Sequence, residues 1–327
     1  KGYMKAAVVG PNGLEINNIS EPIPKASEVM IRVRACGINR ADAMVASGMA
    51  HGRAGGPGTV PGIEYVGEVV AIGKEVPNLK PGDRVMCSGA AGWAEYAVAD
   101  WGRAIPIPSN SMTWAQASTL PVALQTMHNA AVTAGRFKRG ESIMIQGAST
   151  GVGLMGLQIA RILGAKLIIG SSTNPNRRSR LIEFGADLVV DSRDETWVEQ
   201  VLDATNGEGV DLIVDQISGY SANANLAATK ILGRIVNVGR LGGLTGALNF
   251  DLHAMRRIDY IGVTFRTRTV EEVREIIRAM QKDLWDAVEA GELVIPIDSE
   301  YAMEDAEQAV TYMKANKHFG KIVLRLD

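Results

Sequence analysis

The stretch GASTGVGLMG, residues 147–156, constrains the fold more than any other part of the chain. It follows a strand-like run, residues 142–146, and precedes a helical pattern that extends to Leu163. A break at residues 164–165 leads into a second strand-like run, residues 166–170. This order of strand, turn, helix and strand within about 30 residues is typical of the βαβ unit that binds dinucleotides. The alternative is a tight turn in an α/β domain that binds no nucleotide.

The glycine signature G-x-G-x-x-G occurs once in this stretch, but two registers are possible. Gly151, Gly153 and Gly156 match it literally, although Gly156 falls inside the predicted helix. A phosphate needs free backbone amides at the strand-to-helix turn, with no side chain in the way. Residues 148–153 supply such amides, whereas we expect Gly156 to permit close helix packing. The predicted phosphate contacts are Ala148, Ser149, Thr150, Gly151, Val152 and Gly153.

The end of the second predicted strand distinguishes NADPH from NADH. An NAD site usually has an Asp or Glu there, which binds the ribose hydroxyls, but residues 142–182 contain no carboxylate. Arg177, Arg178 and Arg180 follow the strand instead, and guanidinium groups match a 2′-phosphate in charge and geometry. The alternative for any single arginine is a solvated helix start, but together the three favour NADPH. The predicted contacts to its phosphate are Arg177 as the main one, with Arg178, Ser171 and Ser172.

The sequence pattern changes along the chain in a way that indicates two domains, the number expected for 327 residues. Residues 1–118 contain short apolar runs between Gly and Pro signals, which predict a β-rich domain. Residues 119–262 alternate strand and helix patterns, which predict a parallel sheet wound with helices. Residues 263–327, with a predicted helix over 270–291 and a predicted strand over 294–297, are too short for a third domain. We therefore predict an α/β fold in which residues 1–118 and 263–327 form one domain and residues 119–262 the other.

Charge and composition exclude several classes of protein. A net charge of −2 offers no attraction to nucleic acid or to an anionic membrane surface, and no apolar run reaches the ~18 residues that a membrane span needs. Cys36 and Cys87 are the only cysteines, which suits a reducing cytosol and excludes a disulfide framework. The chain enters strand-like sequence within its first residues, without the pattern of a signal peptide. We expect a cytoplasmic protein that acts on a small molecule.

A series of ordered motifs extends over nearly the whole chain. They are residues 37–42 (GINRAD), 61–64 (PGIE), 67–73 (GEVVAIG), 81–85 (PGDRV), 92–96 (GWAEY), 148–153 (ASTGVG), 185–187 (GAD) and 318–323 (HFGKIV). In these motifs the chain resembles the zinc-free medium-chain dehydrogenases/reductases, especially the quinone oxidoreductase family that includes zeta-crystallin. The resemblance implies a GroES-like β-rich catalytic domain, a Rossmann domain and a cofactor in the cleft between them. It also implies that the cofactor is lined by Val238, Gly239, Arg240, Phe265, Arg266, Thr267 and Asn316.

The resemblance raises the question of zinc. Zinc-dependent relatives bind catalytic metal through Cys, His and Cys, and the corresponding positions here are Asn39, Ile63 and Val122. None of these side chains replaces a thiolate or imidazole ligand. The four histidines are widely spread and show no paired spacing. We therefore predict a protein without a metal site.

Without a Lewis acid, alcohol oxidation loses the group that stabilises an alkoxide. Hydride transfer to quinones and α,β-unsaturated carbonyls remains feasible, because conjugation spreads the arriving charge onto an oxygen. A hydrogen-bond donor near that oxygen would help, and Asn39 is the first candidate, with Asp42 to orient its loop. Family position places Thr126 near the nicotinamide, and Tyr65 is a weaker candidate. Their structural alternatives are a turn Asn, a helix-capping Asp, a helix Thr and a core Tyr.

Departures from the family pattern limit the substrate. Met44 and Ala50 stand in the region where quinone oxidoreductases often carry tyrosines, and enoyl-thioester reductases use a tyrosine there as proton donor. Residues 51–58 form instead a glycine-rich loop that could admit a bulky acceptor or act as a lid. The family's tyrosine near the adenosine phosphate appears here as Ser192, so the arginines carry more of the phosphate contact.

These observations predict an NADPH-dependent, metal-free reductase of quinones or activated alkenes. Two alternatives stay open: a non-enzymatic NADPH-binding protein, such as a sensor or a crystallin-like structural protein, and an enoyl-thioester reductase. We also predict a homodimer. Residues 259–265 have the pattern of the last strand of the Rossmann sheet, with an apolar edge that relatives pair with its twofold copy.

Overall fold

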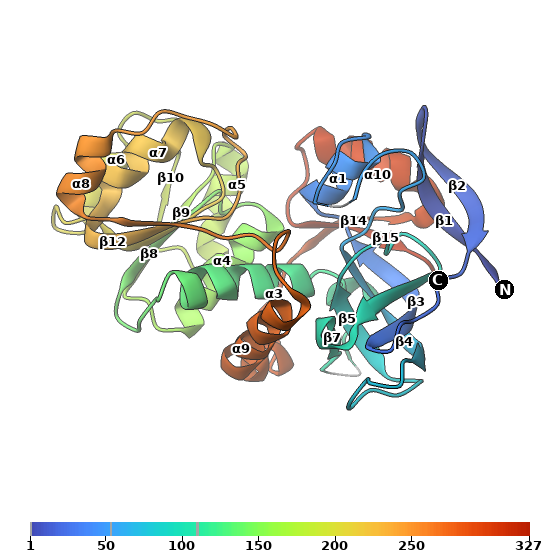
Figure 1. Cartoon of the computed structure of the whole chain (residues 1–327). Helices are drawn as coiled ribbons and strands as arrows, with labels where there is room; N and C mark the ends of the chain where they lie inside the picture. Colours follow the sequence, from blue (N-terminus) through green and yellow to red (C-terminus); the bar gives the residue numbers. More distant parts are fainter. Residues whose placement is uncertain (1, 53, 109–110) are drawn as a thin grey trace. The chain divides into compact units, whose positions relative to one another are not determined.

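The computed structural model describes residues 2–52, 54–108 and 111–327 (Figure 1). The chain divides into two compact units, each with its own apolar core. Unit 1 comprises Lys1–Val122, Phe265–Arg278 and Val294–Asp327, and unit 2 comprises Ala123–Thr264 and Ala279–Leu293.

The predicted domains and these units differ mainly in one long segment; residues 119–122 also group with unit 1 and residues 263–264 with unit 2. The sequence predicts all of residues 263–327 in the β-rich domain, whereas Ala279–Leu293 groups with unit 2. The reason is α9 (Val270–Glu289), a long helix whose second half packs within unit 2, where Asp283 lies 2.7 Å from His128. The domain boundaries themselves, after residues 118 and 262, stay a prediction.

Unit 2 is built on a six-stranded sheet in which every neighbouring pair is parallel. Its strands are β8 (Ser142–Gln146), β9 (Leu167–Ser171), β10 (Leu188–Val190), β11 (Val210–Asp215), β12 (Thr229–Asn237) and β13 (Asp259–Gly262). The order β10-β9-β8-β11-β12-β13 means that the chain leaves β8 first to one side and later returns to the other. In such sheets, ligands bind beyond the carboxyl ends of the strands where the direction reverses.

Helices cover both faces of this sheet. They are α3 (Pro121–His128), α4 (Gly151–Ile162), α5 (Pro175–Arg180), α6 (Trp197–Ala204), α7 (Ala222–Ala228) and α8 (Phe250–Arg256), with a π-helical turn over Asn129–Ala134. Figure 1 shows α6, α7 and α8 on one face and α3 and α4 on the other. Because both faces are covered, β8 is buried over its whole length, and its three central residues are apolar.

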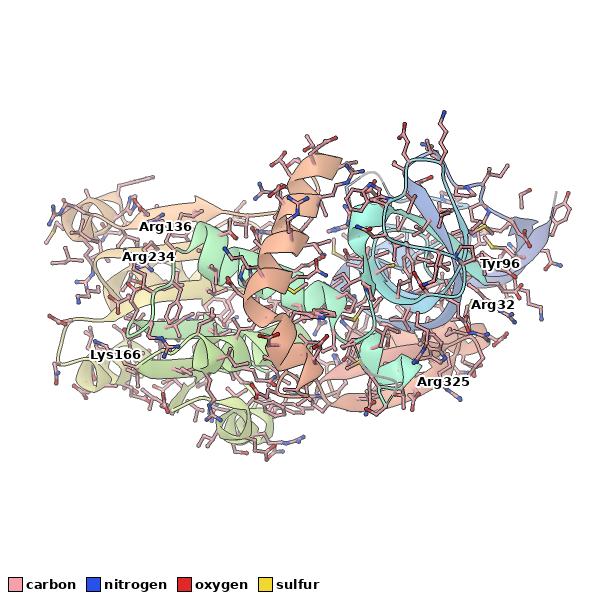
Figure 2. All side chains as sticks on the ribbon, turned by 90° about the horizontal axis from the view of Figure 1, so that it is seen from below. Arg32, Tyr96, Arg136, Lys166, Arg234 and Arg325 are labelled. Carbon is pink, nitrogen blue, oxygen red and sulfur yellow. The ribbon has the colours of Figure 1, made fainter. Side chains whose placement is uncertain are left out.

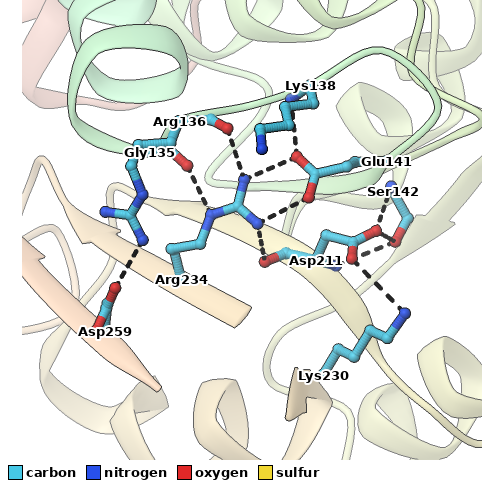
Figure 3. A network of polar contacts seen from close by, with 9 residues as sticks. All are labelled: Gly135, Arg136, Lys138, Glu141, Ser142, Asp211, Lys230, Arg234 and Asp259. Atoms are coloured by element: carbon cyan, nitrogen blue, oxygen red, sulfur yellow. Dashed lines mark hydrogen bonds and ion pairs between the residues drawn. The ribbon is translucent and has the colours of Figure 1, made fainter. Parts of the chain in front are cut away.

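A buried arginine holds the amino-terminal side of the unit 2 sheet (Figure 3). Arg234 on β12 donates to the carbonyl oxygens of Gly135 (2.7 Å) and Arg136 (3.1 Å), and Figure 2 marks the two arginines side by side. It also donates to both carboxylate oxygens of Glu141 (2.8 Å each) and, at 3.4 Å, to the carbonyl of Asp211. All five N–H groups of the guanidinium therefore have an acceptor. Burial raises the pKa of Glu141, but Arg234 and a backbone donor outweigh it and hold the pKa below its ordinary value.

Unit 1 contains a seven-stranded sheet and a separate two-stranded sheet, β1-β2. Its strands are β1 (Tyr3–Gly10), β2 (Gly13–Ser20), β3 (Glu28–Gly37), β4 (Glu64–Ile72), β5 (Arg84–Ser88), β6 (Tyr96–Asp100), β7 (Ala104–Pro106), β14 (Ile297–Ala302) and β15 (Lys321–Arg325). The larger sheet has the order β14-β15-β3-β4-β5-β7, and β6 also pairs with β3, where Arg32 lies opposite Tyr96 (Figure 2). The antiparallel pairing of β15 with β3 brings the end of the chain beside its first long strand.

The strands of unit 1 are accompanied by α1 (Arg40–Ala46), α2 (Trp114–Ala117), α10 (Ala306–Lys314) and the part of α9 up to Arg278. The core between α10 and the strands contains Tyr65, Trp93 and Met303. Within the described residues, no helix is long and apolar enough to cross a membrane. The predicted α/β fold class, a β-rich part and a doubly wound parallel sheet, is confirmed.

Candidate functional site

The glycine-rich turn connects β8 to α4 in unit 2. Gly147 has a φ of +75°, a left-handed conformation that favours glycine. Thr150 caps the helix, because its Oγ1 accepts from the amide of Gly153 at 2.9 Å. The amides of Gly151 and Val152, the first two of the helix, have no carbonyl within the helix to bind. They are the donors that an anion at this end of α4 would use.

Two glycines of the motif let α4 approach the sheet. A Cβ at Gly153 would lie 2.5 Å from the carbonyl oxygen of Gly147 and 2.7 Å from Ala148, closer than any allowed contact. A Cβ at Gly156 would lie 3.0 Å from the sulfur of Met127. Gly156 therefore serves helix packing, as predicted, while the phosphate-binding role of the turn stays a prediction.

Buried polar side chains hold this turn, and two of them, Gln146 and Gln216, were missed by the sequence analysis. Gln216 Nε2 donates to the carbonyl oxygen of Gly147 at 2.8 Å. The hydroxyl of Ser171 accepts from the amide of Gly147 (2.9 Å) and donates to Gln146 Oε1 (2.5 Å). Ser171 is fully buried, and its only hydroxyl proton is already donated. The structure thus corrects one predicted phosphate contact: Ser171 holds the turn and has no proton left for a phosphate.

The three arginines after β9 differ in their partners. Arg178 donates to the carbonyl oxygen of Ser172 (3.0 Å) and lies 3.5 Å from the carboxylate of Asp191. Arg180 pairs with the carboxylate three residues further along the chain, at 3.5 Å. Arg177 is half-buried, and within the described ranges its guanidinium has no partner. Arg177 is therefore the arginine of α5 whose charge is free to meet a phosphate.

Tyr220 is another residue that the sequence analysis missed. It follows β11, yet its hydroxyl lies 2.9 Å from the hydroxyl of Ser192, which follows β10. The guanidinium of Arg193 stacks on its ring, 3.5 Å from the ring centre. A tyrosine hydroxyl thus lies beside Ser192, the position where the family pattern has a tyrosine. No spacing in the sequence indicates this, because the two loops meet only in the folded chain.

The remaining predicted cofactor contacts belong to both units. In unit 2, the hydroxyl oxygens of Ser149 and Ser172 lie 3.0 Å apart. Also in unit 2, directly after β12, are Val238, Gly239 and Arg240. Unit 1 contains Phe265, Arg266, Thr267 and Asn316, and there Asn316 Oδ1 accepts from Arg40 at 2.6 Å. The contacts of these residues with a cofactor stay predictions.

The predicted catalytic residues Asn39 and Asp42 lie together at the start of α1 in unit 1. Asn39 is the N-cap residue, and its backbone amide donates to Asp42 Oδ2 at 2.8 Å. The other carboxylate oxygen of Asp42 accepts from the amides of Gly62 (3.2 Å) and Ile63 (3.0 Å). Burial raises the pKa of Asp42 to about 7, although the backbone donors and Lys321 oppose the rise. Asp42 therefore ties the loop of Asn39 to the segment before β4.

Two charged residues that the sequence analysis did not select complete this cluster. Lys321 Nζ lies 2.7 Å from Glu64 Oε1, with 5% of the lysine side chain exposed and none of the glutamate. The side chain of Asn39 joins both: its Oδ1 accepts from Lys321 Nζ (2.9 Å), and its Nδ2 donates to Glu64 Oε1 (3.1 Å). Glu64 Oε2 accepts from the amide of Val122 at 2.7 Å. All three positions that correspond to zinc ligands in relatives are thus bound by Glu64 or Asp42.

The other two catalytic candidates lie elsewhere. Tyr65 on β4 is fully buried in the core of unit 1, and its hydroxyl donates to the carbonyl of Val98 at 3.3 Å. Burial raises its pKa further above the ordinary tyrosine value. Tyr65 is therefore a core residue, which corrects its prediction as a catalytic candidate. Thr126 on α3 groups with unit 2, and it is the half-buried member of a helix whose other residues are buried.

The donor set around these positions does not resemble a metal site. Ile63 and Val122 carry aliphatic side chains, and the side chain of Asn39 is bound to Lys321 and Glu64. In the part of the chain that the structure describes, no group of three or more His, Cys, Asp and Glu residues could hold a metal ion. The absence of zinc from the active protein stays a prediction.

Comparisons with known proteins agree with this architecture. Residues 25–109 match the alcohol dehydrogenase GroES-like domain, and residues 151–282 match the zinc-binding dehydrogenase family. The human protein named quinone oxidoreductase is 30% identical over 97% of this chain and 95% of its own length. The rat quinone oxidoreductase is 28% identical over the same shares of both chains.

Solved structures share the whole fold. A probable oxidoreductase from Mycobacterium abscessus superposes with a TM-score of 0.85 at 27% identity and covers 99% of both chains. A mycobacterial protein solved in complex with NADPH superposes with a TM-score of 0.86 at 23% identity, over 99% of this chain and 100% of its own, which shows the shared fold. The chain therefore belongs to the quinone oxidoreductase family of the medium-chain dehydrogenases/reductases, NAD(P)-dependent oxidoreductases with a GroES-like domain and a Rossmann domain.

Proposed function

We propose that the protein is an NADPH-dependent reductase of quinones or other conjugated carbonyl compounds that acts without a metal ion. The observation that carries the proposal is the chemistry of three positions, Asn39, Ile63 and Val122, which correspond to metal ligands in zinc-dependent relatives. They offer an amide and two aliphatic side chains, none of which is a zinc ligand. A conjugated acceptor suits such a site, because its own oxygen takes up the charge and needs only a hydrogen-bond donor.

The cofactor is NADPH, which supplies the hydride when it is bound. The residues of unit 2 fit it. The first two amides of α4 are free for a pyrophosphate, and a side chain at Gly153 would push the helix away from the turn. Among the residues that the structure describes, the guanidinium of Arg177 has no partner and can meet the 2′-phosphate, and residues 142–182 contain no carboxylate that would repel that phosphate.

Reduction of a quinone to a hydroquinone takes up one hydride and one proton, and the proton comes from water. In unit 1, Asn39 Nδ2 donates to Glu64 at 3.1 Å and to the carbonyl of Gly37 at 3.4 Å. The longer bond is weak. An acceptor oxygen can therefore replace it at little cost, which supports Asn39 as the donor that stabilises charge on the reduced acceptor.

The alternative substrate class is an enoyl thioester. Met44 is exposed at the end of α1, and Ala50 follows it where related thioester reductases have a proton-donating tyrosine. Neither side chain donates a proton, so we propose quinones and small enones as the substrates. Residues 51–58 stay a proposed entrance or lid for the acceptor. His51 and Ala54 are paired there by two backbone hydrogen bonds (2.8 and 3.1 Å), and Arg53 lies outside the described residues.

The test is NADPH oxidation, followed by absorbance, with a naphthoquinone, an alkenal and an enoyl thioester in parallel. We expect turnover of the naphthoquinone, slower turnover with NADH, and no loss of activity in the presence of a chelator. Turnover confined to the enoyl thioester would replace the proposed substrate class. Tight NADPH binding without turnover of any acceptor would favour the non-enzymatic alternative. We also propose that the protein is cytoplasmic and homodimeric.

A further inference from the structure

We propose that Lys321 and Glu64 are positioning residues. They hold the side-chain amide of Asn39 in one orientation, so that its NH2 group is the end that meets an acceptor oxygen. The inference rests on the proposed function, because there Asn39 donates to that oxygen. Glu64 begins β4 and Lys321 begins β15, so their meeting depends on the antiparallel strands on either side of β3.

The three side chains form a closed triangle of contacts. Lys321 Nζ lies 2.7 Å from Glu64 Oε1 and 2.9 Å from Asn39 Oδ1. Asn39 Nδ2 lies 3.1 Å from the same oxygen of Glu64. Each group of the triangle thus contacts the other two.

The chemistry of the triangle permits one orientation of the amide. The ammonium of Lys321 is only a donor, and an ionised Glu64 is only an acceptor. A flipped Asn39 amide would place its NH2 group against the ammonium and its oxygen against the carboxylate. The pair therefore keeps the NH2 end of Asn39 on the side of Glu64, where its second hydrogen points to the carbonyl of Gly37 at 3.4 Å.

Burial and packing make this arrangement stiff. The side chain of Lys321 is 5% exposed, whereas Lys80, which forms an ion pair of the same length with Asp83 (2.7 Å), is 80% exposed. A Cβ at Gly37 would lie 2.5 Å from Glu64 Oε1 and 2.7 Å from Lys321 Cε, so the backbone closely borders the pair. In such a site a charge without its partner is costly, and the ion pair has little freedom to rearrange.

The first experiment removes both charges together. Lys321→Met alone leaves Glu64 buried and unpaired, which can prevent folding, so the informative variant is the double substitution Glu64→Gln with Lys321→Met. We expect it to fold and to bind NADPH with an unchanged dissociation constant, because the phosphate-binding turn lies in unit 2. Its kcat with a naphthoquinone should fall about tenfold to hundredfold, the effect of one hydrogen bond to a charged group. Lys80→Met, the matched exposed lysine, should leave kcat unchanged.

A double-mutant cycle separates positioning from general damage. Asn39→Ala should lower kcat in the natural background, and it should cause almost no further loss when Glu64→Gln and Lys321→Met are already present. A double variant with the natural kcat would overturn the proposal. A loss from Asn39→Ala that is the same in both backgrounds would also overturn it.

A second readout needs no activity and no variant. With asparagine labelled by ¹⁵N, the side-chain NH2 of Asn39 should exchange with solvent far more slowly than that of Asn17, which is exposed on β2. Exchange as fast as that of Asn17 would overturn the proposal, whether or not the double variant folds. If the natural protein reduces no acceptor, the proposed function fails, and this measurement still tests whether the NH2 group of Asn39 is held in place.

Discussion

Replacing Arg177 by alanine should weaken NADPH binding and leave NADH binding almost unchanged. The turn between β8 and α4 would bind the pyrophosphate of either cofactor through backbone amides, so this part of the site does not discriminate. Discrimination falls to the end of β9 and to α5. There the guanidinium of Arg177 has no partner in the described residues, while that of Arg178 lies 3.5 Å from Asp191.

The structure also indicates the size of the effect. A hydrogen bond to a charged group contributes about 1.5–3 kcal/mol, which is about tenfold to hundredfold in affinity. Because the guanidinium of Arg177 has no hydrogen bond or ion pair to give up among the described residues, Arg177→Ala should show this factor in full. Arg178 already donates to the carbonyl of Ser172 (3.0 Å), and its pair with Asp191 is partly exposed. We therefore expect Arg178→Ala to cost about 1 kcal/mol or less, roughly fivefold in affinity.

The assay measures the dissociation constants of NADPH and NADH by calorimetry for Arg177→Ala, Arg178→Ala and Arg180→Ala. Arg180 is the matched control, since it is exposed on the same helix and pairs with Glu183 at 3.5 Å. Added salt should reduce the difference between NADPH and NADH, because it screens the phosphate. A preference for NADH in the natural protein would refute the charge argument itself. If Arg177→Ala leaves the NADPH dissociation constant unchanged and Arg178→Ala raises it strongly, only the choice of residue is refuted.

Three further predictions concern stability, pH and assembly. Arg234→Met should lower the free energy of unfolding by about 3–5 kcal/mol in urea titrations, because it leaves the carboxylate of Glu141 without its ionic partner and the carbonyls of Gly135 and Arg136 without this donor; a loss below about 1 kcal/mol would contradict the role given to the network. The pKa of Asp42 is raised from 3.8 to about 7 in the folded protein, so the folded state binds this proton more tightly and stability should fall as pH rises across that window. Asp42→Asn should remove this part of the slope, and an unchanged slope would show that the carboxyl group titrates normally. Light scattering should give twice the mass of the 34.9 kDa chain, because β13 is an edge strand of the unit 2 sheet; a monomer mass at micromolar concentration would exclude the homodimer.

The parts of the fold that depend on local pattern were predictable. The strand, turn and helix around the glycine motif are observed as β8 (Ser142–Gln146) and α4 (Gly151–Ile162), with β9 (Leu167–Ser171) next. The signals for these elements lie within the segment itself. They are an apolar run, the helix-capping Thr150, and Gly153, where a side chain would collide with the preceding turn. The predicted strand over residues 294–297 was wrong, because β14 begins only at Ile297. Pro296 precedes it, and proline has no N–H to donate to a neighbouring strand.

Exposure of polar groups was less predictable than their position. Ser171 lies where a phosphate contact is expected, but its hydroxyl already accepts from the amide of Gly147 and donates to Gln146 Oε1. Tyr65 directly follows the family motif of residues 61–64, yet it is fully buried, in a run over residues 64–67 where both faces of β4 are covered. Periodicity tells which face of a strand is buried only when the direction of the core is known, and that direction comes from the packing of other segments.

Contacts between segments that are distant in the sequence were the hardest to predict, and they say the most about the site. Lys321 and Asn39 are 282 residues apart. The sequence of each motif is as compatible with an exposed loop as with a buried site. Only the pairing of β15 with β3 brings the lysine to the start of α1, and only burial shows that its charge needs Glu64. A buried charge in a fold of this kind is retained against a desolvation cost, so it is the first place to look for residues that orient a reacting group. In a protein with aliphatic side chains at two of the positions where relatives bind metal, the ammonium of Lys321 is a buried cation in contact with Asn39, and we propose that the catalytic half of the site is organised around its ion pair with Glu64.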